Sequence, residues 1–251
     1  MPSIYAATTD GVVYSDQNLV ASTAGWTACR GASTGNVVYN SIINSTAGTF
    51  VKKWTDAGSG QFTIRRSFFA FDTSGVGSTP SNCAGNATLK IYGYTYGTAD
   101  VIVVKATAPD LSTGVALGDF NALYGWDSSF EPSDLTAYSA EVATWSTSGY
   151  NEITLNDADL SDMDDLAVFK VAIMEYDYDY SSVEYDPGAI GEVAAGMYYR
   201  EASDSGKRPV ITYAATSCGY NHSIDGAPAA NIGGVTGVNT ADIANRSGAP
   251  T

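Results

Sequence analysis

One run of the sequence places carboxylates and tyrosines in strict alternation. Residues 175–180 read Glu-Tyr-Asp-Tyr-Asp-Tyr, and the acidic side chains are Glu175, Asp177 and Asp179. In an extended strand, alternate residues face the same side, so the three carboxylates would share one face and the tyrosines the other. Carboxylate oxygens grouped in this way are ligands that calcium prefers, although the run lacks EF-hand spacing. The sequence therefore offers one candidate structural calcium site, beside the plainer interpretation of a solvated acidic rim next to a tyrosine-lined core edge.

Groups that could perform catalysis are scarce. His222 is the single histidine, so a Ser-His-Asp or Cys-His arrangement would have to use it. A zinc site lacks ligands, and no Gly-rich loop stands between a strand and a helix to hold phosphates. The sequence does not show whether two carboxylates lie close enough together for glycoside hydrolysis, so a glycosidase is left as an alternative. We expect a protein that is not an enzyme, with no catalytic residue and no cofactor apart from the candidate calcium.

Aromatic side chains on a β-sheet can stack on sugar rings, and they more often fill the core. The chain has four tryptophans among its aromatic residues, and these are the candidates for a sugar platform: Trp26, Trp54, Trp126 and Trp145.

The excess of acidic residues argues against two classes of partner. Asp and Glu number 27 against 12 Lys and Arg, which gives a formal net charge of −15. A chain this acidic is repelled by phosphate backbones and by anionic lipid surfaces. No stretch approaches the ~20 apolar residues that a membrane helix needs. We expect neither a nucleic acid nor a membrane as partner.

The composition suggests a protein that works outside cells, whereas the N-terminus does not resemble an export signal. Residues 1–11 contain no basic segment and no apolar stretch, so they do not resemble a signal peptide. The chain is nevertheless poor in Lys and rich in Ser, Thr, Gly and Tyr. A virion protein, assembled in the host cytoplasm and released by lysis, fits both observations. The alternative is a mature extracellular or cell-surface protein whose leader has been removed.

The three cysteines do not form a Cys-x-x-Cys pair. They are Cys29, Cys83 and Cys218. A Cys29–Cys83 disulfide is one interpretation, and three small, partly buried thiols are the other.

Two runs with period-2 alternation stand at the centre of the chain, at 62–72 and 87–92. Phe62, Ile64, Arg66 and Phe68 would share one strand face, and Thr63, Arg65, Ser67 and Phe69 the other. Further strands are predicted at 11–14, 36–43, 49–54, 100–106, 150–155, 167–174, 197–201 and 209–213, with loops at 21–25 and 31–35 and a short surface helix within 156–166. About ten short strands separated by turn signals predict an all-β, jelly-roll-like antiparallel β-sandwich over residues 1–216.

Residues 217–251 are of a different kind. Gly226, Gly237 and Gly248 recur every 11 residues. The glycines and Pro228 disfavour a helix, and such a segment cannot bury enough surface by itself. We expect an extended Gly-rich repeat tail that is held by copies of itself or by another protein, with Ile224, Ile232, Val235 and Ile243 as apolar anchors.

Several segments resemble a known family. Four segments are similar to the jelly-roll domains appended to secreted polysaccharide-active and cell-surface proteins. They are residues 66–74, 87–92, Tyr198–Ala202 and Lys207–Tyr213. Residues 119–126, 150–156 and 175–179 and the C-terminal repeat resemble a subset found in marine phage structural proteins. The resemblance marks the fold, and it transfers no catalytic or sugar-binding residue.

We therefore expect a virion structural protein, either a capsid decoration or a tail or fibre subunit. Its tail would join it to other virion proteins or to copies of itself. The first alternative is a carbohydrate-binding module or adhesin that recognises surface glycans. The second is a subunit of an extracellular matrix or filament.

Overall fold

The computed structural model describes residues 1–17, 23–56, 59–77, 83–126, 131–186 and 190–216. For Gln17, Thr23, Ala47, 54–56 and 59–60 it describes the backbone alone. The repeat tail therefore lies outside the described residues. The described part of the chain is all-β, as predicted. Its strands are β1 (Ser3–Tyr5), β2 (Gly11–Gln17), β3 (Val37–Asn40), β4 (Asn44–Asp56), β5 (Ser59–Asp72), β6 (Cys83–Gly97), β7 (Val101–Lys105), β8 (Tyr150–Thr154), β9 (Val168–Glu175), β10 (Gly191–Tyr198) and β11 (Val210–Thr216).

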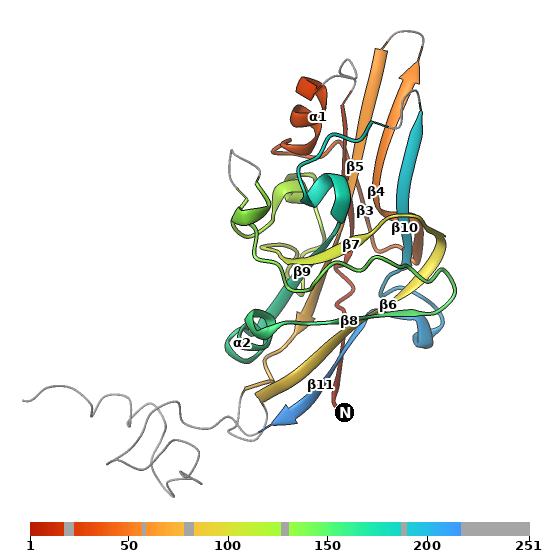
Figure 1. Ribbon diagram of the computed structural model, residues 1–251. Coiled ribbons are helices and arrows are strands. Elements are labelled where there is room, and N and C mark those ends of the chain that lie inside the picture. The colour runs from red at the N-terminus through yellow and green to blue at the C-terminus, as the bar shows by residue number, and fades with distance from the viewer. Residues whose placement is uncertain (18–22, 57–58, 78–82, 127–130, 187–189, 217–251) are drawn as a thin grey trace, which may run out of the picture.

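Hydrogen bonds join these strands into one antiparallel system with the order β1-β11-β6-β10-β4-β5-β2-β3. The long strands β5 and β6 carry most of the pairing. Strand β5 has β2 on one side and, on the other, β4 along its first half and β9 along its second half. Strand β6 lies between β11 and β8 and then continues to β10. In Figure 1, β6, β8 and β11 cross the lower part of the molecule, and β5, β4 and β10 rise to its top.

The first core fills the space between these two groups of strands, in the manner of a β-sandwich. Side chains of β6, β8 and β11 meet side chains of β5, β7 and β9 there, and they include Leu89, Ile153, Ile211, Phe69, Phe71, Val103 and Val171. Because successive side chains of a strand point to opposite faces, a second core forms behind β5 from its other residues. Phe62, Ile64 and Phe68 lie in this second core with Trp26, Phe120 and Leu135.

Short helices and loops cover the second core. They are α1 (Thr23–Arg30), η1 (Leu117–Asn121), η2 (Pro132–Asp134) and the π-helical turn η3 (Tyr176–Tyr180), while α2 (Asp157–Asp165) packs beside β6 and β9 and η4 (Ser205–Lys207) precedes β11. The predicted surface helix is confirmed as α2, where Asn156 caps the N-terminus by accepting a hydrogen bond from the Ala158 N–H. The predicted loop at 21–25 is wrong from Thr23 onward, because α1 begins there and buries Trp26 against Phe62. Among the helices that the structure describes, none is long and apolar enough to cross a membrane.

This arrangement leaves one sheet face open. Along the first half of β5, the face with Ile64 is covered by α1, whereas no element of the described part of the chain forms a second layer over the face with Thr63 and Arg65. The open face is formed by neighbouring parts of β2, β5, β4 and β10.

Candidate functional site

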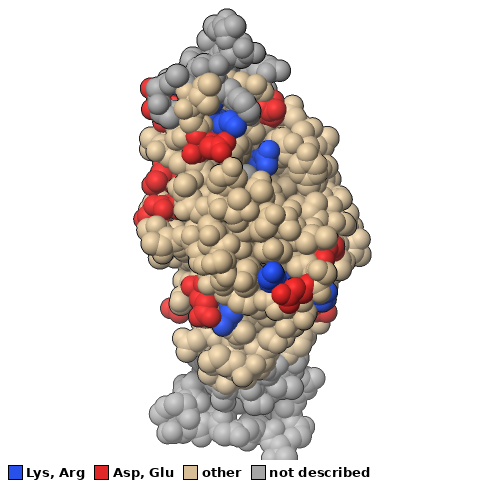
Figure 2. Space-filling model, turned by 90° about the vertical axis from the view of Figure 1, so that its right-hand side faces the viewer, with Lys and Arg blue, Asp and Glu red and all other residues tan. Residues whose placement is uncertain are grey.

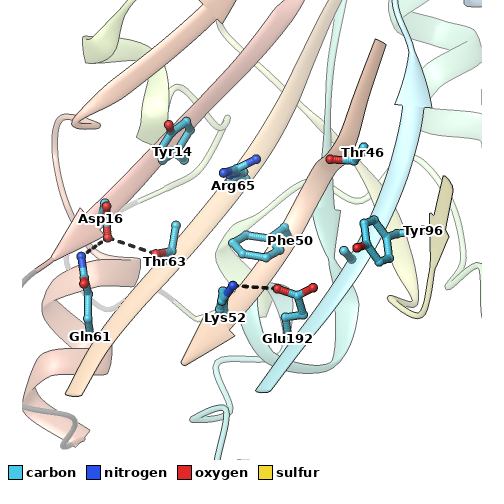
Figure 3. Close-up of a pocket in the computed structure, with 11 residues that line it drawn as sticks. Tyr14, Asp16, Thr46, Phe50, Lys52, Gln61, Thr63, Arg65, Tyr96 and Glu192 are labelled. Atoms are coloured by element: carbon cyan, nitrogen blue, oxygen red, sulfur yellow. Dashed lines mark hydrogen bonds and ion pairs between the residues drawn. The ribbon is translucent and has the colours of Figure 1, made fainter. Parts of the chain in front are cut away.

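A hollow of about 500 Å³ lies on this open face. Its size falls within the range of about 300–1,000 Å³ that is typical of small-ligand sites. Four strands and the end of β6 supply its walls and floor, as Figure 3 shows, and we call it the sheet groove. Its residues are Tyr14, Asp16, Thr46, Phe50, Lys52, Gln61, Thr63, Arg65, Tyr96, Glu192 and Ala194.

Strand register brings these side chains into two rows. Arg65 pairs with Tyr14 of β2 on one side and with Phe50 of β4 on the other, which makes the first row. Two residues earlier on β5, Thr63 pairs with Asp16 and Lys52, and Lys52 pairs with Glu192 of β10; these make the second row. A register shift of one residue in any of these strands would move its groove side chains to the covered face of the sheet.

The first row holds a cation between two aromatic rings. The Arg65 guanidinium carbon lies 4.4 Å from the ring centroid of Tyr14 and 4.9 Å from that of Phe50. Contacts of this kind are attractive because the ring face is electron-rich. Burial, followed by the hydrogen bond to Tyr39, raises the pKa of Tyr14 to about 12, so its hydroxyl is neutral at ordinary pH. Arg65 therefore presents a positioned planar donor group on the floor of the groove.

The second row consists of hydrogen-bonding groups. Asp16 accepts hydrogen bonds from the Gln61 amide and from the Thr63 hydroxyl, the latter at 3.0 Å. Lys52 and Glu192 form an ion pair at 2.9 Å across β4 and β10. Figure 3 shows both sets of contacts below the row of rings. Carboxylate, amide, hydroxyl and ammonium groups thus lie together on the floor, a composition suited to a ligand rich in hydroxyl groups.

Two tyrosines give the site exposed ring surface. Tyr96, at the end of β6, is 43% exposed and lines the groove. Tyr39 of β3 is 48% exposed, and its ring centroid lies 5.8 Å from that of Tyr14. The polar floor therefore has an exposed aromatic ring at its β6 end and another beside its β2 end.

The tryptophans predicted as a sugar platform lie elsewhere. Trp26 is buried under α1, and Trp145 is buried with its Nε1 donating to the Gly196 carbonyl at 2.9 Å. Trp126 is half-buried, and the guanidinium of Arg66 lies 4.5 Å from its ring centroid. The side chain of Trp54 is outside the described residues. The two buried rings cannot stack on a sugar, because protein atoms already cover them.

The run at 175–180 is not extended, which corrects the two-face expectation. Strand β9 ends at Glu175, and Tyr176–Tyr180 form the turn η3 because the buried Glu175 carboxylate accepts the N–H groups of Asp177, Tyr178 and Asp179. Burial raises the pKa of Glu175 to about 8.

The three acidic side chains of the run have different surroundings. Asp179 is buried against Arg66, whereas Asp177 is exposed. Within the described ranges, no group of three or more His, Cys, Asp or Glu side chains is arranged to hold a metal ion. The geometry does not favour calcium at Glu175, Asp177 and Asp179, because the first is engaged by backbone amides and the third by an arginine.

The remaining sequence predictions fall in two groups. Cys29 is a buried thiol outside any disulfide, whereas Cys83 is disulfide-bonded, so these two cysteines are not bridged to each other and the expectation of three thiols is wrong for Cys83. The predicted assembly residues of the tail lie outside the described residues: Ile224, Gly226, Ile232, Val235, Gly237 and Ile243.

Sequence reasoning missed the sheet groove itself. The available signal was the polar face of β5, where Thr63 and Arg65 alternate with Phe62, Ile64 and Arg66. Which residues of β2 and β4 lie beside Arg65 depends on pairing that the sequence does not display. A comparison with known protein families finds no family model that matches the chain, and a comparison with curated proteins finds no match either.

Proposed function

We propose that this chain is a non-enzymatic glycan-binding protein and that the sheet groove holds the saccharide. The observation that carries the proposal is the two-row floor, in which Arg65 is fixed between Tyr14 and Phe50 beside the Asp16–Gln61–Thr63 hydrogen-bonding group. Sugars combine hydroxyl groups with apolar ring faces, so a binding site for them needs polar groups and aromatic rings side by side. Tyr96 supplies the accessible ring.

The resemblance to jelly-roll domains of polysaccharide-active and surface proteins supports the same assignment. In this proposal the domain is displayed on a particle or a surface, as a capsid decoration or a tail or fibre subunit of a virion, and the groove recognises glycans there. Attachment through residues 217–251 to other virion proteins, or to copies of the chain, is a separate part of the proposal. An extracellular adhesin would use the groove in the same way.

Binding of the full-length protein to a glycan array tests the groove. We expect Arg65→Ala and Tyr96→Ala each to weaken binding to the recognised glycan by about tenfold, which corresponds to about 1.4 kcal/mol. Tyr124→Ala is the matched control, since Tyr124 is a 51% exposed tyrosine that lies beside Lys105 of β7 and does not line the groove. A protein that binds no glycan, or whose binding is unchanged in both groove variants, would exclude this function for the groove.

A further inference from the structure

A second group of aromatic rings lies on the outward face of β6, β8 and β10. Tyr92 is in contact with Tyr150 and Tyr198, with ring centroids 5.3 and 5.6 Å apart, and Tyr94 is 5.1 Å from Tyr198. All four rings are half-buried, and each of these pairs meets edge to face. We call these four residues the tyrosine strip.

The strip is held rigidly by its surroundings. The Tyr92 hydroxyl donates to the Ser148 carbonyl at 2.6 Å, and the Tyr150 hydroxyl donates to the Arg208 carbonyl at 3.0 Å. The Lys207 ammonium lies 5.6 Å from the ring centroid of Tyr92 and 5.0 Å from that of Tyr198. Because the rings are already ordered, a ligand that contacts them loses little side-chain entropy.

The strip continues from the sheet groove along β10. Glu192 and Ala194 line the groove. Strand β10 is irregular between Ala195 and Met197, yet both of these side chains lie in the first core, so Ala194 and Tyr198 leave the opposite, outward face. Four residues at about 3.3 Å each place Tyr198 roughly 13 Å beyond Ala194. On β6, the groove residue Tyr96 and the strip residue Tyr94 are separated by Thr95 alone, whose φ of 64° interrupts the extended backbone between them.

We propose that the tyrosine strip is a second subsite for the ligand of the groove, so that the protein binds a neutral polysaccharide chain along both surfaces rather than a short sugar in the groove alone. This inference rests on the proposed function. The groove would fix one stretch of the chain by hydrogen bonds, and the strip would contact the next sugar rings through its exposed tyrosine surface.

Charge favours an uncharged polymer over an acidic one. The formal net charge of −15 repels polyanions. The groove holds two cations, Lys52 and Arg65, beside two carboxylates, Asp16 and Glu192, so it has no formal net positive charge. At the strip, Lys207 lies within ion-pair distance of Asp204. Figure 2 shows the side of the molecule on which β10 and the end of β6 lie in Figure 1, and a broad central area of that side carries no Lys, Arg, Asp or Glu.

Calorimetric titration of the full-length protein with trisaccharides and octasaccharides tests the second subsite. The probes are manno-, xylo- and malto-oligosaccharides, with alginate as the anionic polymer. In the series that binds, we expect the octasaccharide to bind about tenfold tighter than the trisaccharide, which corresponds to about 1.4 kcal/mol. Tyr94→Ala and Tyr198→Ala should remove that gain and leave trisaccharide affinity unchanged. Tyr124→Ala should keep it, and circular dichroism checks that each variant is folded.

The outcomes separate this inference from the proposed function. Trisaccharide binding with no further gain for the octasaccharide, or a gain that survives in both strip variants, overturns the second subsite and leaves the groove in place. Alginate bound more tightly than every neutral sugar overturns the assignment to a neutral polymer. Binding of none of the probes contradicts the proposed function, and the second subsite falls with it.

Discussion

Arg66 and Asp179, which are 113 residues apart in the chain, form a two-point ion pair with no solvent exposure on either side chain. Nε donates to Oδ2 at 2.8 Å and Nη2 donates to Oδ1 at 2.7 Å. Arg66 also donates to the carbonyls of Phe120 and Arg30. The pair ties η1, α1 and η3 to β5 behind the sheet, while the adjacent Arg65 forms the floor of the groove in front. The back of the sheet therefore supports the position of the groove.

We predict that Asp179→Asn destabilises the protein by about 3–5 kcal/mol, because it leaves the Arg66 charge buried without its counter-charge. The midpoint of urea unfolding measures the change. Glu152→Gln is the control, since Glu152 pairs with Lys90 at 2.7 Å and its side chain is 60% exposed. Loss of a solvent-exposed pair of this kind is expected to cost at most about 1 kcal/mol. Equal stability of Asp179→Asn and wild type would show that the buried pair contributes nothing beyond packing.

Gly196 of β10 lies close to the backbone of both β4 and β6. A Cβ at this position would lie 1.7 Å from the Tyr94 carbonyl oxygen and 2.6 Å from that of Thr46. We predict that Gly196→Ala lowers the free energy of unfolding by about 1–3 kcal/mol, because backbone on both neighbouring strands must shift. Gly118→Ala serves as the comparison, since its Cβ would meet no atom within 4 Å. Urea denaturation of both variants measures the free energy of unfolding. Similar decreases in the two variants would contradict the packing argument.

The stability of the protein should fall as pH rises from about 4 to about 8, and Asp159 is one cause. Its side chain is buried in α2, and burial raises its pKa from 3.8 to about 8 although the Asn156 N–H donates to it. Between these two pH values the unfolded chain has this carboxyl ionised while the folded protein keeps it protonated. The contribution is therefore fully present below the lower value and is lost progressively toward the higher one, by at most about 1.4 kcal/mol per pH unit.

Asp159→Asn removes this titration, and urea unfolding at several pH values measures it. Burial also raises the pKa of Asp10 and Glu175, so some decline persists in the variant. Wild type loses this contribution as pH rises and the variant does not. We therefore expect the free energy of unfolding of Asp159→Asn, relative to that of wild type, to increase with pH across this window. A difference that stays constant from acid to mild alkali would mean that Asp159 is ionised in the folded protein.

Residues 217–251 are predicted to mediate assembly. A chain ending at Thr216 should remain folded, because every strand that the structure describes lies between Ser3 and Thr216. Light scattering is expected to give a defined oligomer for the full-length protein and a monomer for the shortened one, with circular dichroism as the folding check. An oligomer that persists after removal of the tail would place the assembly surface on the β-domain instead.

The sequence alone indicated which residues form the central strands. Alternation over 62–72 and 87–92 predicted β5 and β6, because the two faces of a strand are encoded directly by odd and even positions. The short helix within 156–166 was also predicted, and the acidic residues in the first turn of α2 suit the positive end of a helix. These features depend on neighbours within a few positions of the chain.

Two features depended on tertiary structure: the conformation of residues 175–180 and the set of side chains that meet in the groove. Alternation at Glu175–Tyr180 is a strand pattern, yet a buried carboxylate that accepts three amide N–H groups turns the chain there instead. Arg65 meets Tyr14 and Phe50 only because β2, β5 and β4 pair in one particular register, and it faces the groove rather than α1 because that register places Ile64 behind it. Strand pairing joins residues that are far apart in the chain, so the local pattern determined the strands, whereas their long-range packing determined the site.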